Sequence, residues 1–170
     1  KKGEYECVIM QGSGTFSVES VISSSIPAEG KLLILVNGAY GRRIHSIAKV
    51  HNIATEVLDF GEDTLVDPAT VSAALTKDPA ITHVAIVHCE TTTGIINDIN
   101  AIGQVVTAAG RRYIVDSMSA FGGVEVNVPA GNIDFIVSSS NKCVEGVPGF
   151  AFVIAKKVAL DECRGRARTL

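Results

Sequence analysis

The sequence predicts a three-layer, doubly wound α/β fold with a mostly parallel seven-stranded sheet that contains one antiparallel strand. Short apolar, β-branched runs alternate along the chain with longer segments of helical period, which is the pattern of βαβ units. Hydrophobic residues make up 46% of the 170 residues and charged residues only 19%, as expected of elements buried on more than one face. The length corresponds to roughly one domain, since domains most often hold about 100 to 150 residues.

Seven segments have the apolar, β-branched composition of strands. The last two are separated by residues 141–149, which are too few for a helical crossover, so these two strands should pair antiparallel or lie apart. The expected strands are residues 7–10, 32–36, 54–58, 83–87, 113–116, 135–138 and 150–154.

Helices are expected between these strands, because the apolar residues there recur at steps of three and four. Two of them have clear end signals. Asp67 before Pro68 suits an N-cap followed by a first-turn proline, and Gly110 suits the end of a helix. The expected helices are residues 15–25, 40–51, 68–77 and 98–109, and a last one opens near Ala155.

Charge and hydropathy exclude several functions. The net charge of −3, with Lys and Arg scattered, lacks the basic surface of a nucleic-acid-binding protein. No apolar run approaches the roughly 18 residues of a membrane span, and the start lacks a signal peptide, so we expect a soluble cytoplasmic protein without a membrane partner. The absence of an initiator Met and of a closing element at the end favours a fragment of a longer polypeptide.

The cysteines and histidines do not predict a metal site. The sequence has no C-x-x-C and no H-E-x-x-H, so zinc or redox chemistry is not indicated, and the cysteines are expected to be small buried hydrophobes. The four cysteines are Cys7, Cys89, Cys143 and Cys163.

Polar loops follow several strands, at the edge where open α/β sheets bind ligands. After the first strand come Gly12, Ser13, Gly14 and Thr15, directly before a helix. Glycines let the backbone approach an anion, and a helix N-terminus offers free N–H groups, so a phosphate could bind there. A plain turn with a Ser or Thr cap explains these residues equally well.

Two further loops carry candidate ligand contacts. Tyr40 opens the second helix and could stack on a flat heteroaromatic ring, although a tyrosine half-buried on the apolar stripe is the simpler interpretation. Thr91 begins a run of three threonines after the fourth strand, and such hydroxyls can bond a ligand oxygen or simply form a turn. Arg42 and Arg43 lie near the same edge, where a solvated helix face explains them.

Asp116 and Lys142 are the strongest candidates for chemistry. Asp116 ends the fifth strand, where a carboxylate at the rim of a buried strand needs a partner, and a structural salt bridge is the plain alternative. Lys142 follows a polar run and precedes a glycine-rich turn between apolar strands, where desolvation would favour a neutral, nucleophilic amine. Taken together, the loops fit a ligand with a phosphate, a planar ring, a pyridine nitrogen and an aldehyde, namely pyridoxal 5'-phosphate (PLP).

The ordered set of motifs resembles the class V aminotransferases of PLP fold type I along essentially the whole chain. The resemblance implies that residues 1–170 are the PLP-binding large domain, without the N-terminal segment and the C-terminal small domain of such enzymes. The motifs are Ser13-Gly14-Thr15, Asn37-Gly38-Ala39-Tyr40-Gly41, His88-Cys89-Glu90-Thr91-Thr92-Thr93-Gly94, Val115-Asp116-Ser117-Met118-Ser119 and Ser139-Ser140-Asn141-Lys142.

The resemblance also implies roles for single residues. Lys142 would carry PLP covalently and act as a general base, and Asp116 would pair with the protonated ring nitrogen. Tyr40 would stack on the ring and Thr91 would bond near its phenolic oxygen. The phosphate would be bound by Ser13, Gly14, Thr15 and Asn141.

Within the family, residues 141–150 are most similar to the branch that transfers the amino group of 2-aminoethylphosphonate to pyruvate. The expected products are phosphonoacetaldehyde and alanine, and the expected partners are these small molecules and a second subunit of a homodimer. The fragment alone is expected to be inactive, since the family's substrate-binding arginine lies in the C-terminal domain.

Several alternatives stay open. Alanine:glyoxylate or serine:glyoxylate transamination keeps the cofactor and changes the substrates. Cysteine desulfuration is disfavoured, because Tyr40 and Asn141 stand where those relatives have histidines. A non-enzymatic α/β domain that binds a phosphate ligand through residues 12–15 is the alternative from another class.

Overall fold

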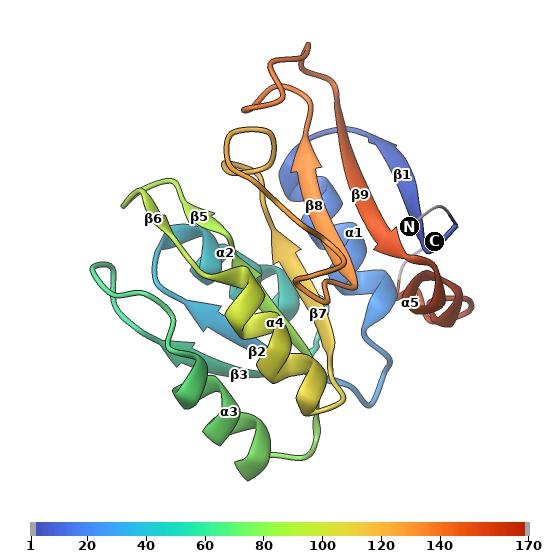
Figure 1. The fold of residues 1–170 in the computed structure, drawn as a ribbon. Helices are drawn as coiled ribbons and strands as arrows, with labels where there is room; N and C mark the ends of the chain where they lie inside the picture. The colour runs from blue at the N-terminus through green and yellow to red at the C-terminus, as the bar shows by residue number, and fades with distance from the viewer. Residues whose placement is uncertain (1–2, 169–170) are drawn as a thin grey trace.

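The structure, a computed structural model, describes residues 3–168 as three layers, with helices on both faces of a central sheet (Figure 1). The strands are β1 (Tyr5–Gln11), β2 (Lys31–Val36), β3 (Ala54–Asp59), β4 (Ile81–Val87), β5 (Cys89–Glu90), β6 (Ile95–Ile96), β7 (Arg112–Asp116), β8 (Phe135–Ser139) and β9 (Phe150–Lys156). The helices are α1 (Gly14–Ser25), α2 (Ala39–Val50), α3 (Pro68–Lys77), α4 (Ile99–Ala108) and α5 (Lys157–Glu162).

The seven-stranded sheet has the order β1-β9-β8-β7-β4-β2-β3. Neighbouring strands from β8 to β3 pair in parallel, whereas β9 pairs antiparallel with both β8 and β1. The predicted fold class, with seven strands and one antiparallel strand, is therefore confirmed. A short hairpin of β5 and β6 forms a separate sheet that the sequence pattern did not predict, since each strand has only two residues.

Two apolar cores lie on the two faces of the sheet. One core includes Ile22 of α1 and Ile44 of α2, and the other includes Val71 of α3 and Ile102 of α4. Strands β2, β4 and β7 contribute side chains to both cores, which explains why their sequences are apolar at successive positions.

The helix ends follow the expected local chemistry. The Asp67 side chain accepts hydrogen bonds from the backbone N–H groups of Ala69 and Thr70, at 3.3 and 2.9 Å. Asp98 caps α4 in the same way, and Gly110 follows α4 in the left-handed conformation, with φ of 69°. The predicted helices are confirmed to within about two residues at their ends.

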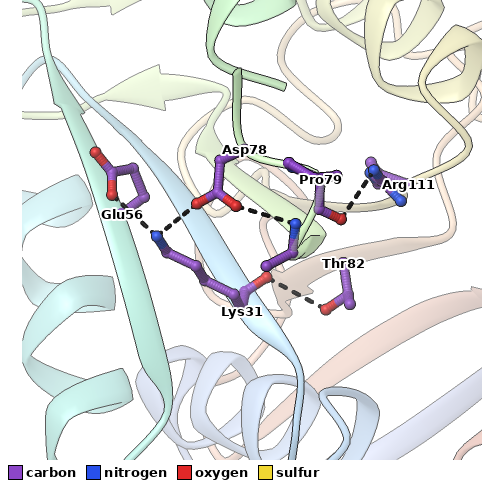
Figure 2. Close-up of polar contacts among 7 residues, drawn as sticks. Lys31, Glu56, Asp78, Pro79, Thr82 and Arg111 are labelled. Atoms are coloured by element: carbon purple, nitrogen blue, oxygen red, sulfur yellow. Dashed lines mark hydrogen bonds and ion pairs between the residues drawn. The ribbon is translucent and has the colours of Figure 1, made fainter. Parts of the chain in front are cut away.

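An ion cluster holds the amino-terminal ends of the central strands together. Figure 2 shows Lys31 Nζ between Glu56 and Asp78, at 3.1 and 2.6 Å from their carboxylate oxygens. The Thr82 hydroxyl donates to the Lys31 carbonyl at 3.2 Å, and Arg111 donates to the carbonyl of Pro79 at 3.1 Å. Because the cluster lies at the amino ends of the parallel strands, the carboxyl ends stay available for other contacts.

Among residues 3–168, no helix combines the length and the apolar character needed to cross a membrane. Within the same range, no group of three or more His, Cys, Asp and Glu side chains is placed to hold a metal ion. Cys7 and Cys143 are exposed and Cys89 and Cys163 are intermediate, so the expectation that the cysteines are buried is wrong.

Candidate active site at the carboxyl ends of the strands

A pocket of about 400 Å³ lies at the carboxyl ends of the parallel strands. Its walls come from the turn before α1, the start of α2, the ends of β4, β7 and β8, and the long turn from β8 to β9, which projects from this edge in Figure 1. A volume of this size is typical of small-molecule sites. The lining residues are Gly12, Ser13, Gly14, Thr15, Tyr40, Arg43, Val87, Cys89, Thr91, Asp116, Met118, Ser119, Ser139, Asn141, Lys142, Pro148 and Gly149.

The turn before α1 has the form of an anion site. Ser13 is the N-cap of α1, and its hydroxyl accepts from the Phe16 N–H at 3.3 Å. Gly12 has φ of 131°, which only glycine adopts easily, and its N–H donates to the Gly149 carbonyl at 3.0 Å. A Cβ on Gly14 would lie 2.3 Å from the Met118 sulfur, so the Met118 side chain packs closely beneath the turn and would have to shift for a larger residue.

Tyr40 forms a half-buried wall of the pocket at the start of α2. The Arg43 guanidinium lies over its ring, 4.9 Å from the centroid, and Arg43 Nη1 donates to the Thr15 hydroxyl at 3.4 Å. Arg43 is exposed, as expected of a solvated helix face, and it also lines the pocket. Its neighbour Arg42 is exposed and pairs with Glu62 at the surface.

Thr91 contributes a hydroxyl at the rim, on the turn of the β5–β6 hairpin. Its Oγ1 is 2.7 Å from the hydroxyl of Ser119, which also lines the pocket. Each hydroxyl can donate or accept, so the pair can bind either a neutral or an anionic ligand oxygen. The hairpin and the segment after β7 are thus joined beside the pocket.

Asp116 is the buried acid of the site, with only 7% of its surface exposed. The pKa of the carboxyl is raised to about 6, mainly by burial and to a smaller extent by the charge of Glu90, whereas the hydrogen bond from the Met118 N–H at 3.0 Å lowers it. Arg43 and Lys142 lower it only through their charge, and within residues 3–168 no side chain forms an ion pair with Asp116. A cationic ligand group would supply the partner that a structural salt bridge does not.

Lys142 lies with Asn141 on the exposed turn between β8 and β9. The base of the turn is held by Ser140, whose carbonyl accepts from the Gly146 N–H at 2.7 Å. The expectation that the surroundings desolvate Lys142 is wrong for this chain, because residues 141–150 are all exposed. Covering this turn requires a ligand or protein atoms beyond the described residues.

The structure brings all eight predicted site residues to one pocket, although they come from five separate segments. Their individual roles stay predictions. Sequence reasoning did not select Arg43 and Ser119, which line the pocket, or Glu90, which is buried and bonds the first turn of α2. The sequence signal that could have found two of them is their spacing from predicted site residues. Arg43 is one helical turn after Tyr40, and Ser119 is three residues after Asp116.

Comparison with known proteins identifies the family of this chain. The model of the family described as Aminotransferase class-V matches residues 2–166. The chain belongs to the class V aminotransferases. This family is PLP-dependent, so the expected cofactor is confirmed at the level of the family.

Several curated relatives of the chain are named 2-aminoethylphosphonate–pyruvate transaminases. Those from Bacillus cytotoxicus and Syntrophobacter fumaroxidans are 55% and 50% identical to this chain over 98% of its length. The one from Vibrio vulnificus is 54% identical over the whole chain. The chain spans about half the length of these curated relatives, 45% to 46% in each case.

Solved structures of aminotransferases have the same fold. A ureidoglycine-glyoxylate aminotransferase from Bacillus subtilis matches 97% of this chain with a TM-score of 0.91 and 28% identity, and the chain covers 43% of it. A pyridoxamine-pyruvate aminotransferase from Mesorhizobium loti matches 95% with a TM-score of 0.89 and 29% identity, and the chain covers 41% of it. The fold is therefore shared with enzymes whose names give different substrates.

The residues around the pocket fit PLP. A glycine turn at a helix N-terminus suits the phosphate, a tyrosine wall suits the ring, and a buried carboxylate that lacks a cationic partner suits the ring nitrogen. The fit rests on the chemistry of these donors and on their position around one cavity.

Proposed function

We propose that residues 1–170 are the PLP-binding large domain of a class V aminotransferase that transfers the amino group of 2-aminoethylphosphonate to pyruvate. The observation that carries the proposal is the convergence of Asp116, Lys142 and the glycine turn on one pocket. Relatives 50% to 55% identical along nearly the whole chain carry the name of this reaction. Because the chain spans about half of their length, the N-terminal segment and small domain would be supplied by the rest of the full-length protein.

The phosphate end of PLP would be held at the start of α1. Ser13, Gly14 and Thr15 present backbone N–H groups and hydroxyls at the positive end of the helix dipole. The ring would lie against Tyr40, whose own ring is kept in place by the Arg43 guanidinium. These contacts orient the cofactor before any chemistry takes place.

The reactive end would be controlled by Asp116 and Lys142. PLP, when bound, supplies a protonated ring that accepts electrons from the substrate carbon bearing the amino group. Asp116 holds the proton at the ring nitrogen, and Thr91 and Asn141 bind ligand oxygens. Lys142 would act as the general base that takes the proton from the substrate carbon and delivers it to the C4' carbon of the cofactor.

We propose further that the enzyme is a cytoplasmic homodimer. The support is the exposed turn of residues 141–150, which carries Lys142 and would need cover from another subunit or from the small domain to exclude water. Light scattering of the full-length protein tests the dimer, and fractionation of the source cells tests the location.

The covalent role of Lys142 can be tested in the full-length protein. The expected result is a yellow chromophore that borohydride fixes to Lys142, as read by peptide mass mapping. Lys142→Ala should abolish the fixed adduct, whereas Lys77→Ala, on the exposed last turn of α3, should retain it. A colourless protein, or an adduct on another lysine, would contradict the proposal.

Amino-donor screening tests the substrates. We expect alanine to form from pyruvate when 2-aminoethylphosphonate is the donor. The similarity to a glyoxylate aminotransferase of solved structure makes glyoxylate the acceptor to compare. Activity with alanine and glyoxylate, and none with 2-aminoethylphosphonate, would overturn the substrate assignment and leave the aminotransferase assignment intact.

A further inference from the structure

Helix α2, which carries Tyr40, lacks a local cap. Its N-cap residue, Gly38, has no side chain to accept the free N–H groups of the first turn. By contrast, Asp67 and Asp98 cap α3 and α4 from the adjacent position in the sequence. A helix that begins at a ligand pocket without a cap would have a poorly fixed first turn.

Glu90 supplies the missing cap from another part of the chain. Its carboxylate accepts hydrogen bonds from the N–H of Tyr40 at 3.2 Å and from the N–H of Gly41 at 2.8 Å. The residue is fully buried, and its negative charge lies at the positive end of the α2 dipole. The two oxygens thus bind two successive N–H groups of the turn that positions the Tyr40 ring.

The surroundings of Glu90 are built to hold it there. A Cβ on Gly38 would lie 2.6 Å from the Glu90 carboxyl carbon, so Gly38 leaves the space that the carboxylate occupies. The Glu90 carbonyl accepts from the Gly94 N–H at 2.7 Å, which closes the β5–β6 hairpin and fixes the Glu90 backbone. The next residue of this hairpin, Thr91, reaches the pocket rim.

We propose that Glu90 is a positioning residue for the cofactor-binding pocket, which by capping α2 holds the Tyr40 ring in the orientation that stacks on PLP. This inference rests on the proposed function. It adds a residue that does not line the pocket, and it explains why a second carboxylate is buried near Asp116 although no ion pair with it forms within residues 3–168.

The decisive measurement is a double-mutant cycle on the PLP dissociation constant of the full-length protein. Glu90→Gln keeps the shape of the side chain and removes the charge, since an amide can accept from one N–H but presents its own N–H₂ to the other. We expect PLP to bind about fivefold to tenfold more weakly, the loss of a typical cap. The visible circular dichroism of bound PLP should also change, because it reports the orientation of the ring.

The cycle separates positioning through Tyr40 from a general loss of stability. If Glu90 acts through Tyr40, Glu90→Gln should add nothing to the loss already caused by Tyr40→Ala. The matched control is Asp67→Ala, which removes the cap of α3, a helix that contributes no residue to the pocket lining, and should lower thermal stability without changing the dissociation constant. Gly38→Ala offers a second route, because its φ of 172° is extended backbone and the added methyl displaces only Glu90.

The outcomes are distinguishable. A dissociation constant within twofold of the wild type in Glu90→Gln or Gly38→Ala, or losses that add fully with Tyr40→Ala, would overturn the role of Glu90. If the wild-type protein itself does not bind PLP, the proposed function would be refuted instead. Weaker binding, altered circular dichroism and non-additivity together would support the positioning role.

Discussion

Replacing Asp116 by Asn should separate the cost of burying this carboxylate from its benefit to the cofactor. Burial raises the pKa of Asp116 to about 6, from an ordinary value of 3.8, with a further contribution from Glu90. Asn has nearly the same shape and can still accept the hydrogen bond that the Met118 N–H now donates at 3.0 Å. The substitution therefore removes the titration and keeps the contact.

The magnitude follows from linkage. One pKa unit is worth roughly 1.4 kcal/mol, so the rise from 3.8 to about 6 corresponds to about 3 kcal/mol. Because the folded protein binds this proton more tightly than the unfolded chain, the contribution of Asp116 to stability is fully present below pH 4. It is lost as the pH rises through about 6. Asn does not titrate, so the cofactor-free Asp116→Asn protein should gain about 3 kcal/mol relative to the wild type between pH 4 and pH 7.

The assay is urea unfolding of both cofactor-free, full-length proteins across this pH range. Groups that titrate alike in both proteins contribute equally to the two free energies of unfolding, so their contributions cancel in the difference. With PLP added, the wild type should be stabilised more than the variant, because only a carboxylate pairs with the protonated ring nitrogen. A difference that stays constant with pH would refute the raised pKa of Asp116. Equal stabilisation of both proteins by PLP would refute the pairing of Asp116 with the ring nitrogen.

Three other predictions concern the fold. Gly103→Ala should lower the free energy of unfolding by about 1–3 kcal/mol or more, because a Cβ there would lie 1.8 Å from the Gly131 carbonyl oxygen and would force α4 outward; thermal unfolding measures this. Burial lowers the pKa of His83 to about 4, so its contribution to stability is present above pH 6.5 and is lost as the pH falls toward 4. In urea unfolding, His83→Gln should reduce the free energy of unfolding that is lost between these pH values by about 3 kcal/mol. An unchanged dependence of the free energy of unfolding on pH would contradict this. Lys31→Met should lower the melting temperature, because the contacts to Glu56 and Asp78 are removed. This decrease in melting temperature should be smaller in high salt. A decrease independent of salt would show that packing of the Lys31 stem, not charge, is responsible.

Local features of the sequence were sufficient for the helices and for the seven strands of the main sheet, but not for the β5–β6 hairpin. Strands such as β4 are apolar at successive positions because both faces are covered, and this periodicity is present before folding. Asp67 and Gly110 mark helix ends through contacts within a few residues, so their effect is also local. The antiparallel placement of β9 followed from the short connection after β8, which cannot hold a crossover helix.

The candidate site was predicted in part. Asp116 and Lys142 were selected because each follows a strand, and the carboxyl ends of parallel strands share one edge of the sheet. Whether these loops converge on one cavity depends on strand order, which places β7 between β8 and β4. The exposure of Lys142 was not foreseen, because burial of a turn depends on whatever packs over it.

Only the tertiary structure decided how the pocket wall is held in place. The bond from the Gly41 N–H to Glu90 joins residues 49 positions apart, and Arg43, which lies over the Tyr40 ring, also donates to the Thr15 hydroxyl on another helix. Periodicity and spacing describe what a residue does to its chain neighbours. They contain no information on which distant N–H group a buried carboxylate will meet, because that pairing exists only after the sheet and its helices have packed.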